Sequence, residues 1–212
     1  MKKMTAFGES NRENITLSNY KKLQDEYSIN TPIFIEDLNN EQLKELKELE
    51  IVGKIKRFDS YVYYFPKESI IGESLLNVQS IIVRRYITNY SDIYGYISGL
   101  FLENLAGVST QVPKILSITT NNIHEGPIIV PVGYSKVKLQ MPLTTVTKEN
   151  VNTLQFLDLL TFIDINHLDE YERKNLIDFK NKLKITDTLV EKYSNLYLNS
   201  DMILESWYTL RS

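Results

Sequence analysis

Residues 94–113 constrain the fold more than any other part of the chain, because they combine an apolar helical pattern with an abrupt stop. Apolar side chains recur at helical spacing at Phe101, Leu102 and Leu105. Small residues precede them and would let a neighbouring backbone approach closely, at Gly95, Ser98 and Gly99. The pattern predicts a helix that begins near Tyr94 and is rich in small residues.

The end of this helix and the start of a strand follow at once. Gly107 suits the left-handed conformation that ends many helices. The residue before Pro113 is biased toward extended backbone. Residues 114–120 then alternate apolar and polar side chains, which is typical of a half-buried strand. A helix, a turn and a strand within so short a span predict a mixed α+β fold.

Composition narrows the classes of function. The 212 residues carry a formal net charge of −3, so any nucleic-acid contact must depend on a local basic patch. Cysteine is absent, which excludes disulfides, zinc–thiolate sites and a cysteine nucleophile. Residues 5–19 lack the apolar core of a secretory signal, and no stretch approaches the ~20 apolar residues that cross a bilayer. We therefore expect a cytoplasmic protein without a membrane partner.

The N-terminal part of the chain predicts a winged helix-turn-helix domain over residues 14–67. Three helices are expected, at residues 17–27, from Thr31-Pro32 onward, and at 41–52 with Asn40 as its cap. Two strands are expected after Gly53, at residues 54–58 and 61–65. Three helices followed by a hairpin are the elements of this fold.

The second predicted domain, residues 74–212, is α+β with a helical C-terminal portion. A helix over residues 74–90 precedes the segment described above, and a hairpin of strands 128–132 and 137–141 follows it. Pro131 should place its strand at an edge or a bulge. The remaining pattern is helical, at residues 151–163, 169–183, 187–198 and 201–210. Trp207 and Tyr208 near the end are expected in the core, with exposed partner anchors as the alternative.

Two blocks of the chain resemble the AbiEi-like antitoxins of type IV toxin–antitoxin systems. In the first, Leu102-Glu103-Asn104-Leu105-Ala106-Gly107 runs into Val108-Ser109-Thr110-Gln111-Val112-Pro113 and then a strand. In the second, Gly53-Lys54-Ile55-Lys56-Arg57 leads to Tyr63-Tyr64-Phe65-Pro66-Lys67. The blocks occur in the order and at the separation found in that family, and the similarity extends over about residues 31–142. It implies a winged helix that represses its own promoter, and a C-terminal domain that counteracts a nucleotidyltransferase toxin, without a stable complex.

Cationic and tyrosine side chains make the predicted hairpin the best candidate for contact with DNA backbone. The predicted DNA-binding residues are Gln42, Lys44, Lys54, Lys56, Arg57, Tyr61 and Lys67. The alternative for the hairpin is a solvated edge, since lysines on edge strands suppress aggregation. Glutamine at a helix start can pair with adenine, although polar residues there often only cap the helix.

The predicted third helix argues against simple insertion into the major groove. A helical projection places Glu41, Lys44, Glu45 and Glu48 opposite the leucines. Three carboxylates and one ammonium make a poor surface for phosphate. The cationic hairpin, rather than this helix, is therefore expected to carry DNA binding.

No catalytic, metal-binding or cofactor motif is evident. His124 and His167 have no second histidine at metal-ligand spacing, and neither a glycine-rich phosphate loop nor a serine elbow occurs. We therefore expect a non-catalytic protein without cofactor or metal, and not the toxin itself. Two further functions stay open: a stand-alone DNA-binding regulator, and a protein-interaction module whose winged helix no longer binds DNA.

Overall fold

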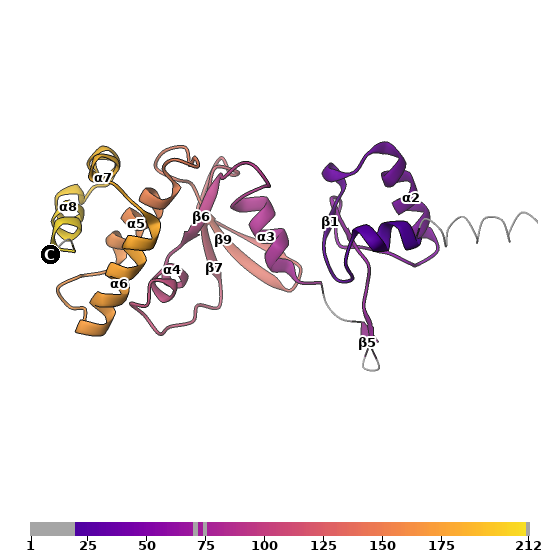
Figure 1. Cartoon of the computed structure of the whole chain (residues 1–212), viewed down its shortest axis with the longest axis horizontal. Helices are drawn as coiled ribbons and strands as arrows, with labels where there is room; N and C mark the ends of the chain where they lie inside the picture. The colour runs from indigo at the N-terminus through magenta and orange to yellow at the C-terminus, as the bar shows by residue number, and fades with distance from the viewer. Residues whose placement is uncertain (1–19, 70–71, 74–75, 211–212) are drawn as a thin grey trace, which may run out of the picture. The chain divides into compact units, whose positions relative to one another are not determined.

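The computed structural model describes residues 20–69, 72–73 and 76–210 of a mixed α+β chain (Figure 1). The chain divides into two compact units, Met1–Ser80 and Ile81–Ser212, called unit 1 and unit 2 below. The start of the predicted winged helix, residues 14–19, lies outside the described residues.

Unit 1 contains a helical segment, a small sheet and a long helix. Residues 20–26 are helical, followed by β1 (Ile33–Phe34), the 3-10 helix η1 (Ile35–Asp37) and α2 (Asn40–Ile51). The strands β2 (Lys56–Arg57) and β3 (Val62–Tyr64) complete an antiparallel sheet of order β1-β3-β2. A short pair, β4 (Glu68–Ser69) and β5 (Gly72–Glu73), precedes α3 (Val78–Tyr86).

The predicted second helix of unit 1 is wrong. Instead of starting a helix at Thr31-Pro32, the chain pairs Ile33 with Tyr63 and Phe34 with Val62, and only then makes one 3-10 turn. Pairing with the central strand buries the Ile33 side chain, which is 1% exposed, and satisfies backbone groups. A threonine-proline step is equally compatible with extended backbone, so the tertiary contact decides.

The core of unit 1 joins the helices to the sheet. Its buried members come from the first helical segment, β1, α2, β3 and the residues flanking the hairpin strands: Leu23, Ile33, Leu46, Leu49, Ile55, Tyr63 and Phe65. The Tyr20 ring packs edge-on against Phe65, with ring centroids 5.4 Å apart. Helix α2 begins with a capping box in which Asn39, not Asn40, is the N-cap.

Unit 2 is built on a four-stranded mixed sheet of order β6-β7-β9-β8. Its strands are β6 (Gly95–Ser98), β7 (Leu116–Thr120), β8 (Ile128–Val132) and β9 (Ser135–Gln140). Only the β7–β9 pair is parallel. Strand β8 is an edge, as Pro131 predicts, because proline cannot donate to a second neighbour.

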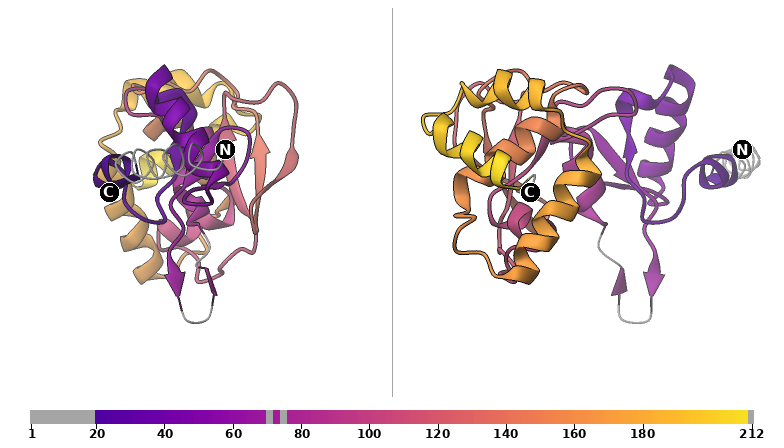
Figure 2. Two further views of the ribbon diagram at one scale, coloured as in Figure 1. Left: turned by 90° about the vertical axis from the view of Figure 1, so that its right-hand side faces the viewer. Right: turned by 60° about the vertical axis from the view of Figure 1, so that its left-hand side comes forward.

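Helices of unit 2 complete the fold around this sheet. They are α4 (Leu100–Leu105), α5 (Val151–Phe162), α6 (Glu170–Leu183), α7 (Asp187–Ser194) and α8 (Ser200–Thr209). The last four agree with the predicted helices to within a few residues and pack together (Figure 2). Trp207 is a core residue, 3% exposed, whose indole donates to Asp187 at 2.8 Å.

The helix predicted from Tyr94 is replaced in its first half by a strand. Gly95 to Ser98 pair with Thr120 to Ser117 along their whole length, and only Leu100–Leu105 is helical. Gly107 ends that helix at a φ of 72°, as predicted, and the Val108 amide donates to the Glu103 carbonyl at 3.0 Å. The small residues therefore serve close approach between strands and loops rather than between helices.

A buried carboxylate joins the sheet of unit 2 to its helices. Asp158 on α5 is 9% exposed and accepts hydrogen bonds from the hydroxyls of Tyr96 on β6 and Tyr197 after α7, both at 2.8 Å. Thr119 on β7 lies 3.5 Å from the same carboxylate and accepts a bond from Gln140 at 2.8 Å. We call Asp158, Tyr96, Tyr197 and Thr119 the Asp158 cluster.

The Asp158 cluster predicts a pH dependence of stability. Burial raises the pKa of Asp158 above its usual value near 3.8, although the bonds from Tyr197, Tyr96 and Thr119 oppose the shift. The folded protein then keeps a proton that the unfolded chain has lost, so this contribution to stability declines as pH rises from about 4 through the folded-state pKa. Asp158→Asn removes the titration. The unfolding free energy of the wild type minus that of the variant should therefore fall as urea melts move from pH 4 to pH 8, and a constant difference would contradict the assignment.

Candidate nucleic-acid interface

The β2–β3 hairpin brings Arg57 and Tyr61 together around Asp59. The Arg57 Nε donates to the Asp59 carbonyl at 3.0 Å, and the Tyr61 amide donates to the Asp59 carboxylate at 2.9 Å. The Arg57 guanidinium also lies over the ring of Tyr63, 5.7 Å from its centroid. Through these contacts both Arg57 and Tyr61, which are exposed, are tied to Asp59 at the tip of the hairpin.

Three lysines of the prediction lie at other points of unit 1. Lys54 is exposed just before β2, with its Nζ 5.9 Å from the centroid of the Tyr20 ring. Lys56 is half-buried and lies opposite Tyr64 in the β2–β3 ladder. Lys67 is exposed between Pro66 and the start of β4. Among the described residues, Lys54, Arg57 and Lys67 form no ion pair that would neutralise them, whereas Lys56 has a further interaction.

The hairpin is fastened to α2 by a buried tyrosine. Tyr63 is 4% exposed and donates its hydroxyl to the Glu50 carboxylate at 3.1 Å. Burial raises the pKa of Tyr63, and the bond and charge of Glu50 raise it further while Arg57 lowers it. Because β3 is the central strand of its sheet, this bond fixes the hairpin against the C-terminal end of α2.

The exposed face of α2 differs from the helical projection in one decisive residue. Glu45 is buried at 8% exposure, whereas Glu41, Lys44, Lys47 and Glu48 are exposed. The solvent-facing surface therefore carries two acids and two bases instead of three acids and one base. The expectation that Glu45 lies on the exposed face is wrong, while Glu41, Lys44 and Glu48 lie on it as expected. Lys47 was missed although it lies three residues after Lys44, a spacing that puts both on one side of a helix.

Gln42 is used inside the protein at both ends of its amide. Its carbonyl accepts from the Asn39 amide at 3.0 Å, completing the capping box. Its Nε2 lies 3.2 Å and 3.3 Å from the two carboxylate oxygens of Glu26, on the preceding helical segment. This arrangement favours the capping alternative for Gln42 over contact with a base edge.

One of the two histidines contacts a carboxylate. His167 shares a 2.7 Å contact with the carboxylate of Asp164 in an exposed loop. The described part of the chain holds no group of three or more histidine or acidic side chains placed to bind a metal ion. None of its helices is long and apolar enough to cross a membrane.

Comparisons of the chain with protein-family models, curated proteins and solved structures find no match.

Proposed function

We propose that the chain is an AbiEi-like antitoxin and autorepressor in which unit 1 is a winged helix-turn-helix that binds operator DNA. The carrying observation is the order of elements in unit 1: a helical segment, β1, one 3-10 turn, α2 and the β2–β3 hairpin. The second strand of this hairpin, β3, also pairs with β1. Winged helices use the helix before the hairpin and the hairpin itself to contact DNA. Exposed cations lie on both of these elements here.

The exposed residues of α2 in the structure favour DNA binding more than the residues expected from the helical projection. With Glu45 buried, the fully exposed charges of α2 cancel, so its solvent-facing surface opposes a phosphate backbone less than the helical projection suggested. Lys44 and Lys47 then join Lys54, Arg57 and Lys67 as exposed cations of unit 1. We assign Gln42 to capping and the cations to contacts with the sugar–phosphate backbone.

Removing the hairpin cations should weaken DNA binding for all sequences. Lys54→Ala combined with Arg57→Ala removes two potential phosphate contacts, so the slope of log K against log salt should shrink by roughly 2. Affinity for the upstream region of the gene should fall roughly tenfold or more near 0.1 M salt. Fluorescence anisotropy with labelled duplexes, from about 0.05 to 0.3 M salt, measures both quantities.

The matched control removes two exposed lysines from unit 2. Lys174→Ala with Lys182→Ala changes the net charge by the same amount on helix α6, away from the hairpin sequence. This control should keep the wild-type salt slope. Thermal melts of both double variants show whether the Arg57 contacts to Asp59 and Tyr63 matter for folding. An unchanged slope in a folded Lys54/Arg57 variant would refute the hairpin assignment.

The antitoxin role has its own test. Where a nucleotidyltransferase is encoded next to the gene, co-expression with it should restore growth of cells that this enzyme alone arrests. The Lys54/Arg57 variant should still restore growth when both genes are expressed from foreign promoters, because neutralisation is assigned to unit 2. Failure of the wild type to rescue growth would remove the antitoxin role and leave the DNA-binding proposal standing.

A further inference from the structure

Unit 2 has a pocket that none of the DNA-binding features uses. It has a volume of about 260 Å³, smaller than the pockets of drug-sized ligands. It lies where α4, the strands β7 and β9, and the end of α5 come together. The side chains that matter for its chemistry are Leu100, Glu103, Ser117, Lys138, Gln140 and Phe162.

Part of the pocket wall is apolar and accessible to solvent. Phe162, the last residue of α5, is 57% exposed, and Leu100, the first residue of α4, is 45% exposed. A large aromatic side chain left in contact with water at the mouth of a pocket offers a surface for stacking. The walls therefore suit a flat, apolar group.

Hydrogen-bond acceptors line the pocket without a partner among the described residues. Glu103 is half-buried and its carboxylate forms no hydrogen bond or ion pair there. Burial raises the pKa of Glu103, which is the cost of desolvating a carboxylate that nothing compensates. Gln140 is fixed by the bond from its Nε2 to Thr119, at 2.8 Å, which leaves its carbonyl oxygen as a second acceptor. Among the described residues, the Glu103 carboxylate therefore has no hydrogen-bond donor bound to it.

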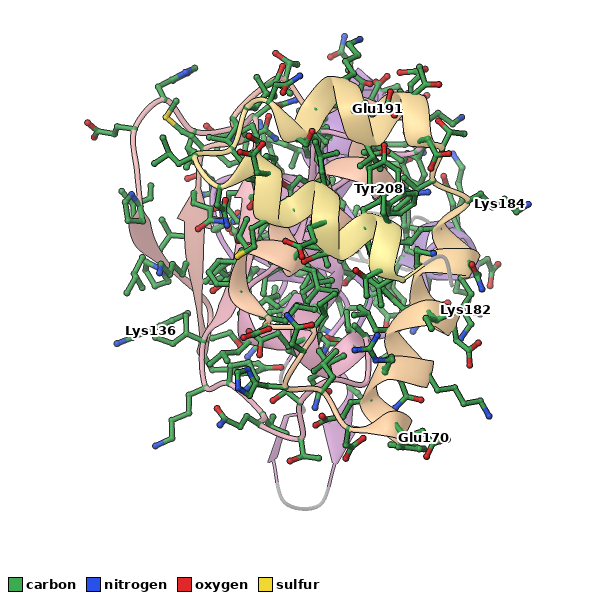
Figure 3. All side chains as sticks on the ribbon, turned by 90° about the vertical axis from the view of Figure 1, so that its left-hand side faces the viewer. Lys136, Glu170, Lys182, Lys184, Glu191 and Tyr208 are labelled. Carbon is green, nitrogen blue, oxygen red and sulfur yellow. The ribbon has the colours of Figure 1, made fainter. Side chains whose placement is uncertain are left out.

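Two lysines lie on the same face of β9 as Gln140. Lys138 and Lys136 lie two and four residues before Gln140, so strand geometry places them about 7 Å and about 13 Å along the strand. Lys138 pairs with Ser117 on β7 and Ile129 on β8, and both lysines are exposed. Figure 3 shows Lys136 projecting away from the sheet into solvent. Neither ammonium pairs with a described acidic residue, so this face can receive an anion.

We propose that this pocket binds a nucleotide whose base carries an exocyclic amino group. The base stacks on Phe162 and Leu100, and its N–H groups donate to Glu103 and Gln140. The phosphate contacts Lys138, which lines the pocket, with Lys136 further along the strand. A ligand with hydrogen-bond donors at one end and an anion at the other matches both the Glu103 carboxylate and the Lys138 ammonium. An amine alone or a phosphate alone matches only one of them. The same chemistry comes from a free mononucleotide or from one residue of a single strand.

The test is calorimetric titration of the full chain with nucleoside monophosphates. Those of adenine, guanine or cytosine should bind at least fivefold more tightly than that of uracil, and removal of the phosphate should weaken binding at least fivefold. Lys138→Ala should remove the preference for the phosphate, so that a nucleoside and its monophosphate bind this variant with equal affinity. Glu103→Gln should reduce the preference against uracil. The glutamine side chain presents one carbonyl acceptor and one amino donor in place of the two carboxylate oxygens of Glu103.

Lys182→Ala is the matched control, because Figure 3 places Lys182 on the other side of unit 2 from Lys136. It should bind as the wild type does. Short single-stranded oligonucleotides, titrated into the Lys54/Arg57 variant to silence the hairpin of unit 1, distinguish the two sources. Tighter binding than the monophosphate identifies a nucleotide within a strand, and equal or weaker binding identifies a free nucleotide. No binding of any monophosphate at millimolar concentration, or binding that Lys138→Ala and Phe162→Ala leave unchanged, would overturn the proposal without affecting DNA binding by unit 1.

Discussion

Replacing Asp158 with alanine is expected to destabilise unit 2 by about 3 kcal/mol. The substitution leaves the hydroxyls of Tyr96 and Tyr197 buried without their acceptor, and each such loss costs on the order of 1–3 kcal/mol. Relief from burying the carboxylate offsets part of this cost. Trp207 is the only tryptophan of the chain and lies in the core of unit 2, so its fluorescence follows the unfolding of this unit in urea.

Asp178→Ala is the control for the Asp158 variant. Asp178 is exposed on α6, also within unit 2, and surface substitutions of this kind usually change stability by less than about 0.5 kcal/mol. If Asp158→Ala unfolded at the same urea concentration as Asp178→Ala, the carboxylate would not be the acceptor that joins β6, α5 and the turn after α7. Tyr96→Phe would then be expected to be neutral as well.

The Asp158 cluster also shows what the sequence could not supply. The helix over residues 151–162 was predicted correctly from its pattern, but nothing in that pattern marks Asp158 as buried. Its two tyrosine partners lie 62 and 39 residues away in sequence, and such distances have no local signature. The same holds for Ile33-Phe34, where pairing with β3 replaced a local helix signal.

Local signals succeeded where neighbouring residues determine the structure. The turn between β8 and β9, the glycine that ends α4 and the four C-terminal helices all depend on short-range patterns. The β2–β3 hairpin with Arg57 and Tyr61 also follows from such a pattern, although it is shorter than predicted. The error on α2 came from taking three leucines as the centre of the buried face. Glu45, Leu46 and Leu49 are the buried residues, which rotates the face enough to expose Lys47.

Gly95→Ala is expected to destabilise unit 2 by about 3 kcal/mol or more. An added Cβ would lie 2.0 Å from the Tyr86 carbonyl oxygen and 2.7 Å from the Thr119 carbonyl oxygen. Both atoms belong to backbone, so neither a side-chain rotation nor a small shift of one residue removes the overlap. The strand β6 must move away from β7 or from the end of α3, which breaks ladder bonds beside the Asp158 cluster.

Gly126→Ala separates this steric effect from the general consequence of adding a methyl group to a glycine of unit 2. At Gly126 the nearest atom to the added Cβ is the Ile123 Cδ1 at 3.2 Å, the end of a flexible side chain, and the next contact is 3.5 Å. That variant should therefore stay within roughly 1 kcal/mol of the wild type in the same urea melts followed by Trp207 fluorescence. Equal stability of the Gly95 and Gly126 variants would mean that Gly95 is not pressed between the end of α3 and β7. The small residues before α4 would then need a different explanation from the close approach of backbones in this sheet.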